Sequence, residues 1–312
     1  MDALLKMEVN TIICSPGSRN APLVIAATAR QEFEVLTVLD ERSAAFQALG
    51  MALVQNRPVV VCCTSGSAIA NYYPAVLEAF HSKVPLIVLS ADRPEDRIMK
   101  GEGQTCVQQQ FFEPHIRHSQ HYNEEVSQES FLTSLSAIYT ALQEKQPVHI
   151  NVAFNEPLYE LVDSSPAIDI ALASFQVDYA NDLSRGMSLL SNAKQVAMII
   201  GQLAPNQSRQ LRARLDRADH DHLYFADATS GLLDHPKVTS LSKIVNYQPD
   251  AVLSFGGQWI DKKPKFHLRS LRIKTHVHVD PYQCWDVVDA GELVHVKAEA
   301  DCIDATQLSK FS

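Results

Sequence analysis

The sequence predicts an α/β fold made of two open, mostly parallel sheets with helices on both faces. Apolar, β-branched runs of four to six residues alternate with stretches of helical periodicity. This alternation is typical of parallel strands that are buried on both faces. A chain of 312 residues, 46% of them hydrophobic, is long enough for a large core, and its length favours two domains.

The alternation is clearest in the first half of the chain. The expected strands are Thr11–Cys14, Val35–Leu39, Val59–Cys63, Leu86–Ser90 and Val148–Ala153, and the expected helices are Pro22–Ala29, Arg42–Val54, Ala68–Phe80 and Phe131–Leu142. In open α/β sheets ligands bind beyond the carboxyl ends of the strands, so the loops that follow these strands are the first place to look for a site.

A second alternating series follows Asn155–Ser165, a stretch without clear period that we interpret as a linker. We therefore expect a first domain over residues 1–165 and a middle domain over 166–312. The strands expected in the second domain are Val196–Ile200, Leu223–Ala226, Ala251–Phe255 and His276–Val279, with a helix over Gln207–Arg217. No Gly-x-Gly-x-x-Gly fingerprint follows any strand, so the sequence does not indicate a dinucleotide site.

Composition excludes several classes of protein. A net charge of −9 argues against non-specific nucleic-acid binding, which needs a basic surface. An acidic protein that binds anions must concentrate its basic groups locally. The six cysteines include no Cys-x-x-Cys pair, and Cys62 and Cys63 are adjacent, which suits reduced thiols better than disulfides. With no signal peptide and no apolar run near 18 residues, we expect a cytoplasmic protein without a membrane span.

Three loops after expected strands carry the residues of most interest. They are Ser15-Pro-Gly-Ser-Arg-Asn20, Asp40-Glu-Arg42 and Thr64-Ser-Gly-Ser-Ala-Ile-Ala-Asn71. Ser18 and Arg19 would stand at a helix N-terminus, which favours anions, and Glu41 opens the next helix. Each also has a plainer explanation: a solvated arginine, a carboxylate that favours a helix start, and an ordinary turn.

In the third loop, Gly66 permits a tight turn and a close approach of the backbone to a ligand. Ser65 or Ser67 can cap the helix that follows. A turn with a single glycine is weak evidence by itself, but the run continues into Asn71-Tyr-Tyr-Pro-Ala75.

Together the three loops resemble the pyrimidine-binding domain of thiamine-diphosphate enzymes, and in detail the family of 2-succinyl-5-enolpyruvyl-6-hydroxy-3-cyclohexene-1-carboxylate (SEPHCHC) synthases. The resemblance implies that Glu41 is the catalytic carboxylate, because such enzymes need one beside the aminopyrimidine N1′ of thiamine diphosphate to help remove the C2 proton. It implies further cofactor contacts from Thr64, Ser65, Gly66, Asn71 and Gln104.

The same resemblance implies two anionic substrates, 2-oxoglutarate and isochorismate. Candidate contacts are Ser18, Arg19, Arg93, Gln104, Lys262 and Lys263. Arg93 lies in Ala91-Asp-Arg-Pro94 and can hold a carboxylate with both nitrogens. Gly103 replaces the asparagine that the family usually has before this glutamine. The two lysines stand where the family often has Lys-Arg, and taken alone they suit a solvated loop after Ala251–Phe255.

In this family Mg²⁺ or Mn²⁺ binds through a Gly-Asp-Gly motif of a carboxy-terminal domain, and no Gly-Asp-Gly occurs in these 312 residues. We therefore expect the chain to be an amino-terminal two-domain portion, with no metal ligands of its own and no synthase activity alone. The resemblance also implies a homodimer or a dimer of dimers, because the cofactor lies between domains of two subunits.

Other interpretations stay open. An acetolactate-synthase-like carboligase is one, and a non-catalytic binding module is another. His220-Asp-His222 and His276-Val-His278 have spacing that suits a metal, and residues i and i+2 of a strand share a face. No cysteine or carboxylate cluster completes either pair in the sequence, so we expect no metal site there.

Overall fold

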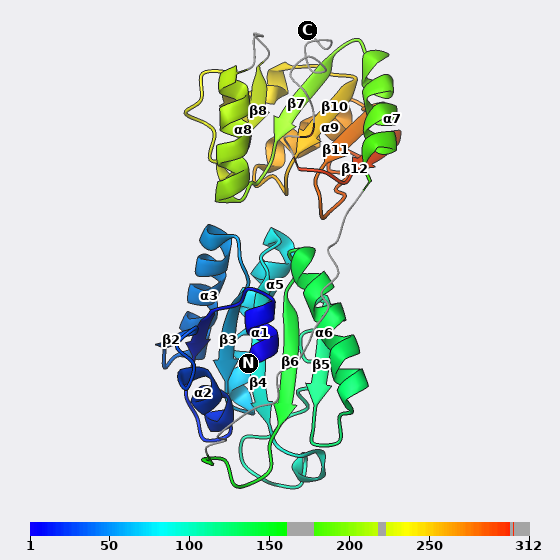
Figure 1. The fold of residues 1–312 in the computed structure, drawn as a ribbon. Helices are drawn as coiled ribbons and strands as arrows, with labels where there is room; N and C mark the ends of the chain where they lie inside the picture. Colours follow the sequence, from blue (N-terminus) through cyan, green and yellow to red (C-terminus); the bar gives the residue numbers. More distant parts are fainter. Residues whose placement is uncertain (161–177, 218–222, 300–301, 303–312) are drawn as a thin grey trace. The chain divides into compact units, whose positions relative to one another are not determined.

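The computed structural model describes residues 1–160, 178–217, 223–299 and 302, and the chain divides into two compact units, Met1–Phe175 and Gln176–Ser312 (Figure 1). The boundary between the units falls among residues 161–177, outside the described ranges. The predicted linker over Asn155–Ser165 lies partly outside them too. The domain limits at residues 165 and 166 therefore stay predictions.

The described part of the first unit holds one six-stranded sheet in the order β2-β1-β3-β4-β6-β5, and every pair of neighbours is parallel. The strands are β1 (Thr11–Cys14), β2 (Glu34–Thr37), β3 (Val59–Cys63), β4 (Leu86–Asp92), β5 (His118–Tyr122) and β6 (Val148–Ala153). Strand β5 was not predicted. Its sequence, His-Ser-Gln-His-Tyr, has no apolar run, and a strand at the edge of the sheet can be polar in this way because it is less buried.

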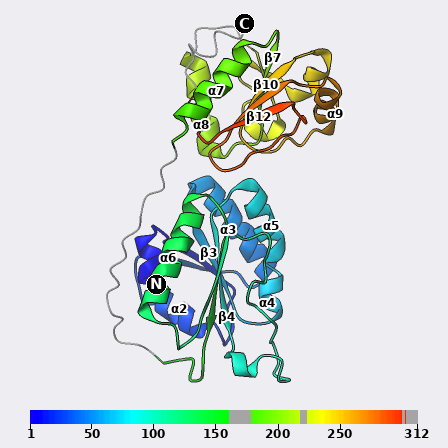
Figure 2. The ribbon, with the colours of Figure 1, turned by 90° about the vertical axis from the view of Figure 1, so that its right-hand side faces the viewer.

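Helices cover both faces of this sheet (Figure 2), as the sequence predicts. On one face lie α1 (Asp2–Lys6), α2 (Ala21–Thr28) and α6 (Gln128–Gln143), and on the other lie α3 (Glu41–Gln55), α4 (Ser67–Ala70) and α5 (Tyr73–Ser82). The prediction of one helix over Ala68–Phe80 is wrong. The chain breaks between α4 and α5, because Pro74 has no N–H to continue the helix and is favoured in a first turn.

The second unit has its own all-parallel sheet of six described strands, in the order β12-β11-β10-β7-β8-β9. The strands are β7 (Val196–Ile200), β8 (Tyr224–Ala226), β9 (Val238–Ser240), β10 (Ala251–Phe255), β11 (Thr275–Val279) and β12 (Glu292–Val296). One face carries α7 (Ala180–Ser191) and α8 (Pro205–Arg217), and the other carries α9 (Lys262–Ser270) and the 3₁₀ segment Leu241–Asn246. Numbered from β7, this is the doubly wound order 3-2-1-4-5-6.

Each sheet has a switch point, where the order of strands reverses and where open α/β sheets bind ligands. In the first unit it lies between β1 and β3, and in the second between β7 and β10. In the second unit the loops at this point touch directly, since the Gly257 N–H donates to the Gln202 carbonyl at 2.8 Å. A Cβ on Gly201 would lie 2.1 Å from the Gly257 carbonyl oxygen.

His276 and His278 share one face of β11, as their spacing predicts. Both rings contact the hydroxyl of Ser254, at 2.7 and 2.8 Å, and all three residues are buried. The His276 ring also contacts Asp286 at 3.2 Å. Among the described residues no group of three His, Cys, Asp or Glu side chains is placed to hold a metal ion. The His220-Asp-His222 pair lies outside the described residues.

Within the described ranges, no helix combines the length and the apolar character that a membrane crossing requires.

We expect Gly201→Ala to destabilise the second unit by about 1–3 kcal/mol, because the new methyl group would force the two crossing loops apart. Gly50→Ala is the matched control. Nothing lies within 4 Å of a Cβ at Gly50, in the middle of α3, so this substitution should stabilise the first unit by about 0.5–1 kcal/mol. Urea denaturation measures both. A stability of the Gly201 variant equal to that of the parent would contradict the tight crossing.

Candidate active site

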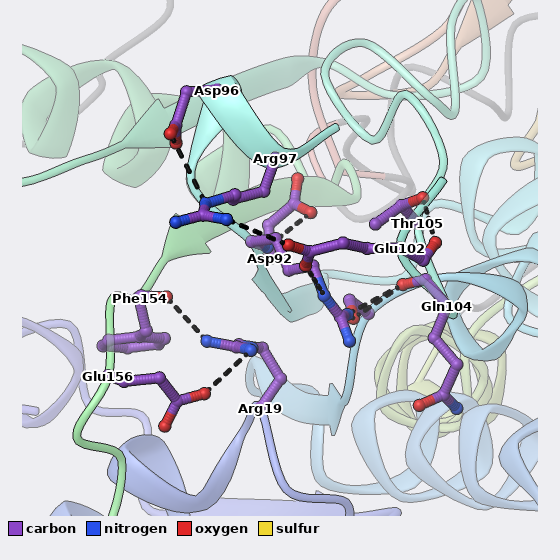
Figure 3. Close-up of polar contacts among 11 residues, drawn as sticks. Arg19, Asp92, Asp96, Arg97, Glu102, Gln104, Thr105, Phe154 and Glu156 are labelled. Carbon is purple, nitrogen blue, oxygen red and sulfur yellow. Dashed lines mark hydrogen bonds and ion pairs between the residues drawn. The ribbon is translucent and has the colours of Figure 1, made fainter. Parts of the chain in front are cut away.

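The carboxyl edge of the first sheet brings together the loops that follow β1, β3, β4 and β6. At the switch point, a Cβ on Gly17 would lie 2.6 Å from the Cβ of Thr64, so the loop after β1 packs closely on the loop after β3. Figure 3 shows the polar contacts at this edge, where Arg19 and Gln104 come from different loops and have different partners.

Asn20 fixes the turn of the β1 loop. Its buried side-chain oxygen accepts from the Gly17 N–H at 2.8 Å, and its side-chain nitrogen donates to the Ser15 carbonyl at 3.0 Å. The same nitrogen lies 3.7 Å from the sulfur atoms of Cys14 and Cys62. This one amide therefore places Ser18 and Arg19 just before α2, with Ser18 exposed to solvent. We did not single out Asn20 from the sequence, although its place in the Ser-Pro-Gly-Ser-Arg-Asn turn was the available signal.

Arg19 reaches from the β1 loop to the segment after β6. Its guanidinium donates to the Phe154 carbonyl at 2.9 Å and pairs with the Glu156 carboxylate at 3.0 Å (Figure 3). The Arg19 side chain is only 13% exposed, whereas that of Glu156 is 67% exposed. Because exposed ion pairs contribute about 0–1 kcal/mol, another carboxylate can replace Glu156 at little cost.

Glu41 is the first residue of α3, as predicted, and its neighbour Asp40 is the helix cap. Asp40 accepts from the Ser43 N–H at 2.7 Å, and this hydrogen bond lowers the pKa of the Asp40 carboxyl. Glu41 is half-buried, and its carboxylate has no hydrogen-bond or ion-pair partner among the described residues. The capping role thus belongs to Asp40, which leaves the Glu41 carboxylate available to a ligand.

The loop after β3 depends on Gly66. This residue has φ of +80°, and a Cβ there would lie 2.8 Å from the backbone of Gln104. The prediction that Ser65 or Ser67 caps the next helix is wrong, because Gly66 occupies the N-cap position and no side chain caps α4. Ser65 is buried and donates to the Gln104 carbonyl at 2.9 Å.

Thr64 and Asn71 are the remaining candidates of this loop, and they stand at its two ends. Thr64 is half-buried under Gly17, and Asn71 is exposed at the end of α4, where its side chain donates to the Ser67 carbonyl at 3.1 Å. Their predicted contacts with a cofactor stay predictions.

Arg93 ties the loop after β4 to the loop after β3. It donates to the Ser65 hydroxyl at 2.8 Å, to the Gln104 carbonyl at 3.1 Å and to the Glu102 carboxylate at 3.1 Å. Gln104 has φ of +56°, and its side chain is exposed. In this arrangement the Arg93 guanidinium is engaged by internal partners, which suits an anchor of these loops.

A buried polar network lies beneath the edge, inside the sheet. Asn151 is at its centre: its side-chain nitrogen donates to Asp92 at 2.8 Å, and its oxygen accepts from Ser90 at 2.7 Å and from Gln108 at 2.8 Å. Ser90 also contacts the ring of His149 at 2.8 Å. We assigned no role to Gln108 or Asn151 from the sequence. The signal that could have found Asn151 is an amide in the middle of a strand whose other residues, apart from His149, are apolar.

Burial governs the ionisation of this network. Loss of solvent raises the pKa of the Asp92 carboxyl, while donors from Asn151 and the Arg93 backbone oppose that rise. Burial lowers the pKa of His149 to about 3, with a smaller contribution from the nearby His121. The imidazole of His149 is therefore neutral at pH 7.

The prediction that Lys262 and Lys263 lie in a loop is wrong. They are the first two residues of α9, with Asp261 as the cap that accepts from the Lys263 N–H at 3.0 Å. Both side chains are exposed. The loop before them is held by Asp227, which accepts from the Ile260 N–H at 2.8 Å. Cations at a helix N-terminus oppose the helix dipole, so helix stability does not explain the pair.

Comparison with known proteins relates the sequence of this chain to thiamine enzymes. Residues 1–116 match the family described as thiamine pyrophosphate enzyme, N-terminal TPP binding domain. The SEPHCHC synthase of Flavobacterium psychrophilum is 37% identical over 288 residues, which are 88% of this chain and 52% of that protein. The enzyme of the same name from Desulfotalea psychrophila is 36% identical over 301 residues, covering 87% of this chain and 54% of that protein. The chain thus spans about half the length of the curated relatives it matches.

Solved structures agree on the fold. Benzoylformate decarboxylase from Polynucleobacter necessarius superposes with a TM-score of 0.72 at 17% identity, covering 99% of this chain and 60% of that one. A thiamin-diphosphate-dependent enzyme from Mycobacterium smegmatis, described as putative, gives a TM-score of 0.70 at 16% identity, covering all of this chain and 62% of that one. At such identities the likeness concerns the fold alone.

We expect the first unit to lose stability in acid because His149 is held neutral. Its pKa is about 3 when folded and 6.5 when exposed, so the unfolded chain binds the extra proton first as pH falls below 6.5. The free energy of unfolding should then fall by about 1.4 kcal/mol per pH unit from this one group.

His149→Gln should remove that slope between pH 6 and 4, approximately, and His81→Gln, at an exposed position, should leave it unchanged. Asp92 acts in the opposite direction, because its raised pKa stabilises the fold in acid, but it is present in all three proteins. Urea titrations across this range measure the slopes. Equal slopes in the parent and the His149 variant would mean that this imidazole is not held neutral.

Proposed function

We propose, since the chain belongs to the family of thiamine-diphosphate enzymes, that it supplies the pyrimidine-binding and middle domains of a SEPHCHC synthase. The complete enzyme would decarboxylate 2-oxoglutarate and add the succinyl unit to isochorismate in a 1,4 sense, releasing CO₂ in menaquinone biosynthesis. Residues 1–165 would form the pyrimidine-binding domain and 166–312 the middle domain. The enzyme would be a cytoplasmic homodimer or dimer of dimers.

The free carboxylate of Glu41 carries this proposal. It stands at the start of α3, one strand away from the switch point, with its capping duty taken by Asp40 and no partner of its own among the described residues. A carboxylate in that state fits the aminopyrimidine of thiamine diphosphate, whose thiazolium supplies the carbanion chemistry. Glu41 would hold the N1′ proton, and the Gly66 turn would let the backbone approach the ring.

The two anionic substrates would be held by groups at the carboxyl edge of the first sheet and on the middle domain. Arg19 and Ser18 would bind a substrate carboxylate, with Gln104 and Arg93 as further contacts, and Arg93 would also hold the loop that carries Gln104. Lys262 and Lys263 would contact isochorismate from the middle domain. Mg²⁺ or Mn²⁺ would bind the cofactor's diphosphate through residues outside these 312.

A related carboligase of acetolactate-synthase type is the second candidate within the same family. Such enzymes usually have an apolar substrate pocket, whereas the edge described here presents Arg19 and a partnered Arg93. A substrate screen with 2-oxoglutarate against pyruvate separates the two.

A non-catalytic binding module is the third hypothesis. It would be favoured if the chain did not take part in binding thiamine diphosphate, either alone or within the extended protein.

The central test is activity. We expect the 312-residue chain to form no SEPHCHC from thiamine diphosphate, Mg²⁺, 2-oxoglutarate and isochorismate, because no Gly-Asp-Gly motif occurs in it. The same chain extended to the length of its relatives should form the product. Product is followed by mass spectrometry. Turnover by the pure 312-residue chain would contradict the proposal that residues outside these 312 bind the diphosphate and its metal. Acetolactate formation by the extended protein would favour the carboligase.

In the extended protein, Glu41→Gln should slow the exchange of the cofactor's C2 proton by about 10²–10⁴, because an amide cannot take part in the acid–base step. Asp40→Asn is the matched control: it alters the adjacent carboxylate, which caps α3, and should change stability more than exchange. Proton exchange is read by NMR after acid quench. Exchange at the parent rate in the Glu41 variant would show that another carboxylate has this role.

Lys262→Ala and Lys263→Ala should raise the Michaelis constant for isochorismate about ten- to a hundredfold and leave that for 2-oxoglutarate nearly unchanged. Loss of a desolvated, charge-assisted contact has an effect of this size, whereas a solvated lysine contributes almost nothing. Lys274→Ala, an exposed lysine of the same unit, serves as control. Unchanged isochorismate kinetics in both variants would leave Lys262 and Lys263 as surface residues.

A further inference from the structure

A buried side chain of the loop after β4 also helps to hold the candidate site. Gln108 lies in the same connection as Gln104, between β4 and β5, and it is fully buried. Its side-chain oxygen accepts from the Gly66 N–H at 2.8 Å. Its side-chain nitrogen donates to the Ala91 carbonyl at 3.1 Å and to the Asn151 side-chain oxygen at 2.8 Å. One amide thus joins the turn after β3 to strands β4 and β6.

The hydrogen bonds continue from Asn151 to Asp92 and Arg93, at the end of β4. Asn151 donates to one carboxylate oxygen of Asp92 at 2.8 Å, and the other oxygen accepts from the Arg93 N–H at 2.8 Å. Asn151 is 1% exposed and Asp92 is fully buried. The backbone of Gly66 and the backbone of Arg93 are therefore the two ends of one buried chain of bonds.

The direction of each bond in this chain is fixed. Ser90 and Gln108 both donate to the Asn151 oxygen, and Asp92 requires a donor, so the Asn151 amide has only one satisfactory orientation. That orientation leaves the Gln108 nitrogen as a donor and its oxygen free to accept from Gly66. A buried network in which every member is satisfied is rigid, and removing one member takes a hydrogen bond from each of its neighbours.

We infer that Gln108 and Asn151 are positioning residues of the candidate site: they set the backbone of the Gly66 turn and of Arg93, and neither contacts a ligand. The inference rests on the proposed function only in assigning that turn and Arg93 to the site. The loops after β3 and β4 consequently move as one body, and the distance between the proposed cofactor turn and the proposed anchor of the substrate loops is set inside the sheet.

Gln108→Met tests the first link in the 312-residue chain. Methionine keeps the side-chain length but offers neither a strong acceptor nor a donor. Exchange of the Gly66 amide proton, followed by NMR, should accelerate about ten- to a hundredfold, because the N–H loses its buried acceptor. Gln109→Met is the matched control at the adjacent, exposed position. The amide of Val61, inside β3, reports any general loss of stability.

Gln108→Glu supplies the rescue. A carboxyl oxygen can still accept from Gly66, so the Gly66 amide should stay within about threefold of the parent rate. An ionised carboxylate offers no donor to Asn151, so exchange at the Arg93 amide should rise. Asn151→Leu should likewise accelerate exchange at Arg93. If Gln108→Met does not fold, these two variants decide the question.

The inference is overturned if Gly66 exchanges no faster in Gln108→Met than in Gln109→Met, or if its rate rises only as much as that of Val61. It is also overturned if Arg93 keeps the parent rate in both Gln108→Glu and Asn151→Leu. Since the measurement involves no ligand, it is independent of the proposed activity. Altered exchange in an extended protein that makes no SEPHCHC would support the positioning role and contradict the synthase assignment.

Discussion

Every described strand of the two sheets runs in the same direction as its neighbours, and this constraint decides where polar groups can gather. The loops that follow parallel strands all lie at the carboxyl edge of the sheet. The crevice between them is widest where the strand order reverses, and ligands bind there. In the first unit the reversal between β1 and β3 sets the Arg19 loop against the Gly66 turn. In the second unit the corresponding loops after β7 and β10 bond to each other, so the two switch points differ in character.

The direction of the strands brings the loops near one another, and buried polar groups then fix their positions. Asn20 holds the first loop, and the chain from Gly66 through Gln108, Asn151 and Asp92 holds the next two. Such groups are costly when unpaired, because each loses its hydrogen bonds to water. Here each amide is satisfied at both ends by the described residues. The rigidity of the edge is therefore a property of the sheet interior and does not require a bound ligand.

The sequence predicted the parallel sheets, because apolar runs of β-branched residues are visible without tertiary context, and it located the loops that follow them. It missed β5, where a polar edge strand carries no apolar signal, and it merged α4 with α5 across Pro74. It placed Glu41 and Arg19 but assigned no role to Gln108 or Asn151. A buried amide looks like a surface amide in a sequence, since its partners come from strands far apart in the chain.

The two arginines of the edge differ in what a carboxylate ligand would meet. Arg93 has three kinds of internal partner, a hydroxyl, a carbonyl and the Glu102 carboxylate, and moving it would separate two loops. Arg19 is paired with a glutamate that is mostly in solvent, so exchanging that carboxylate for another changes few contacts. An acidic protein can keep an arginine neutralised in this way until an anion arrives. The exchangeable pair at Arg19 suits recognition, and the several internal partners of Arg93 suit support.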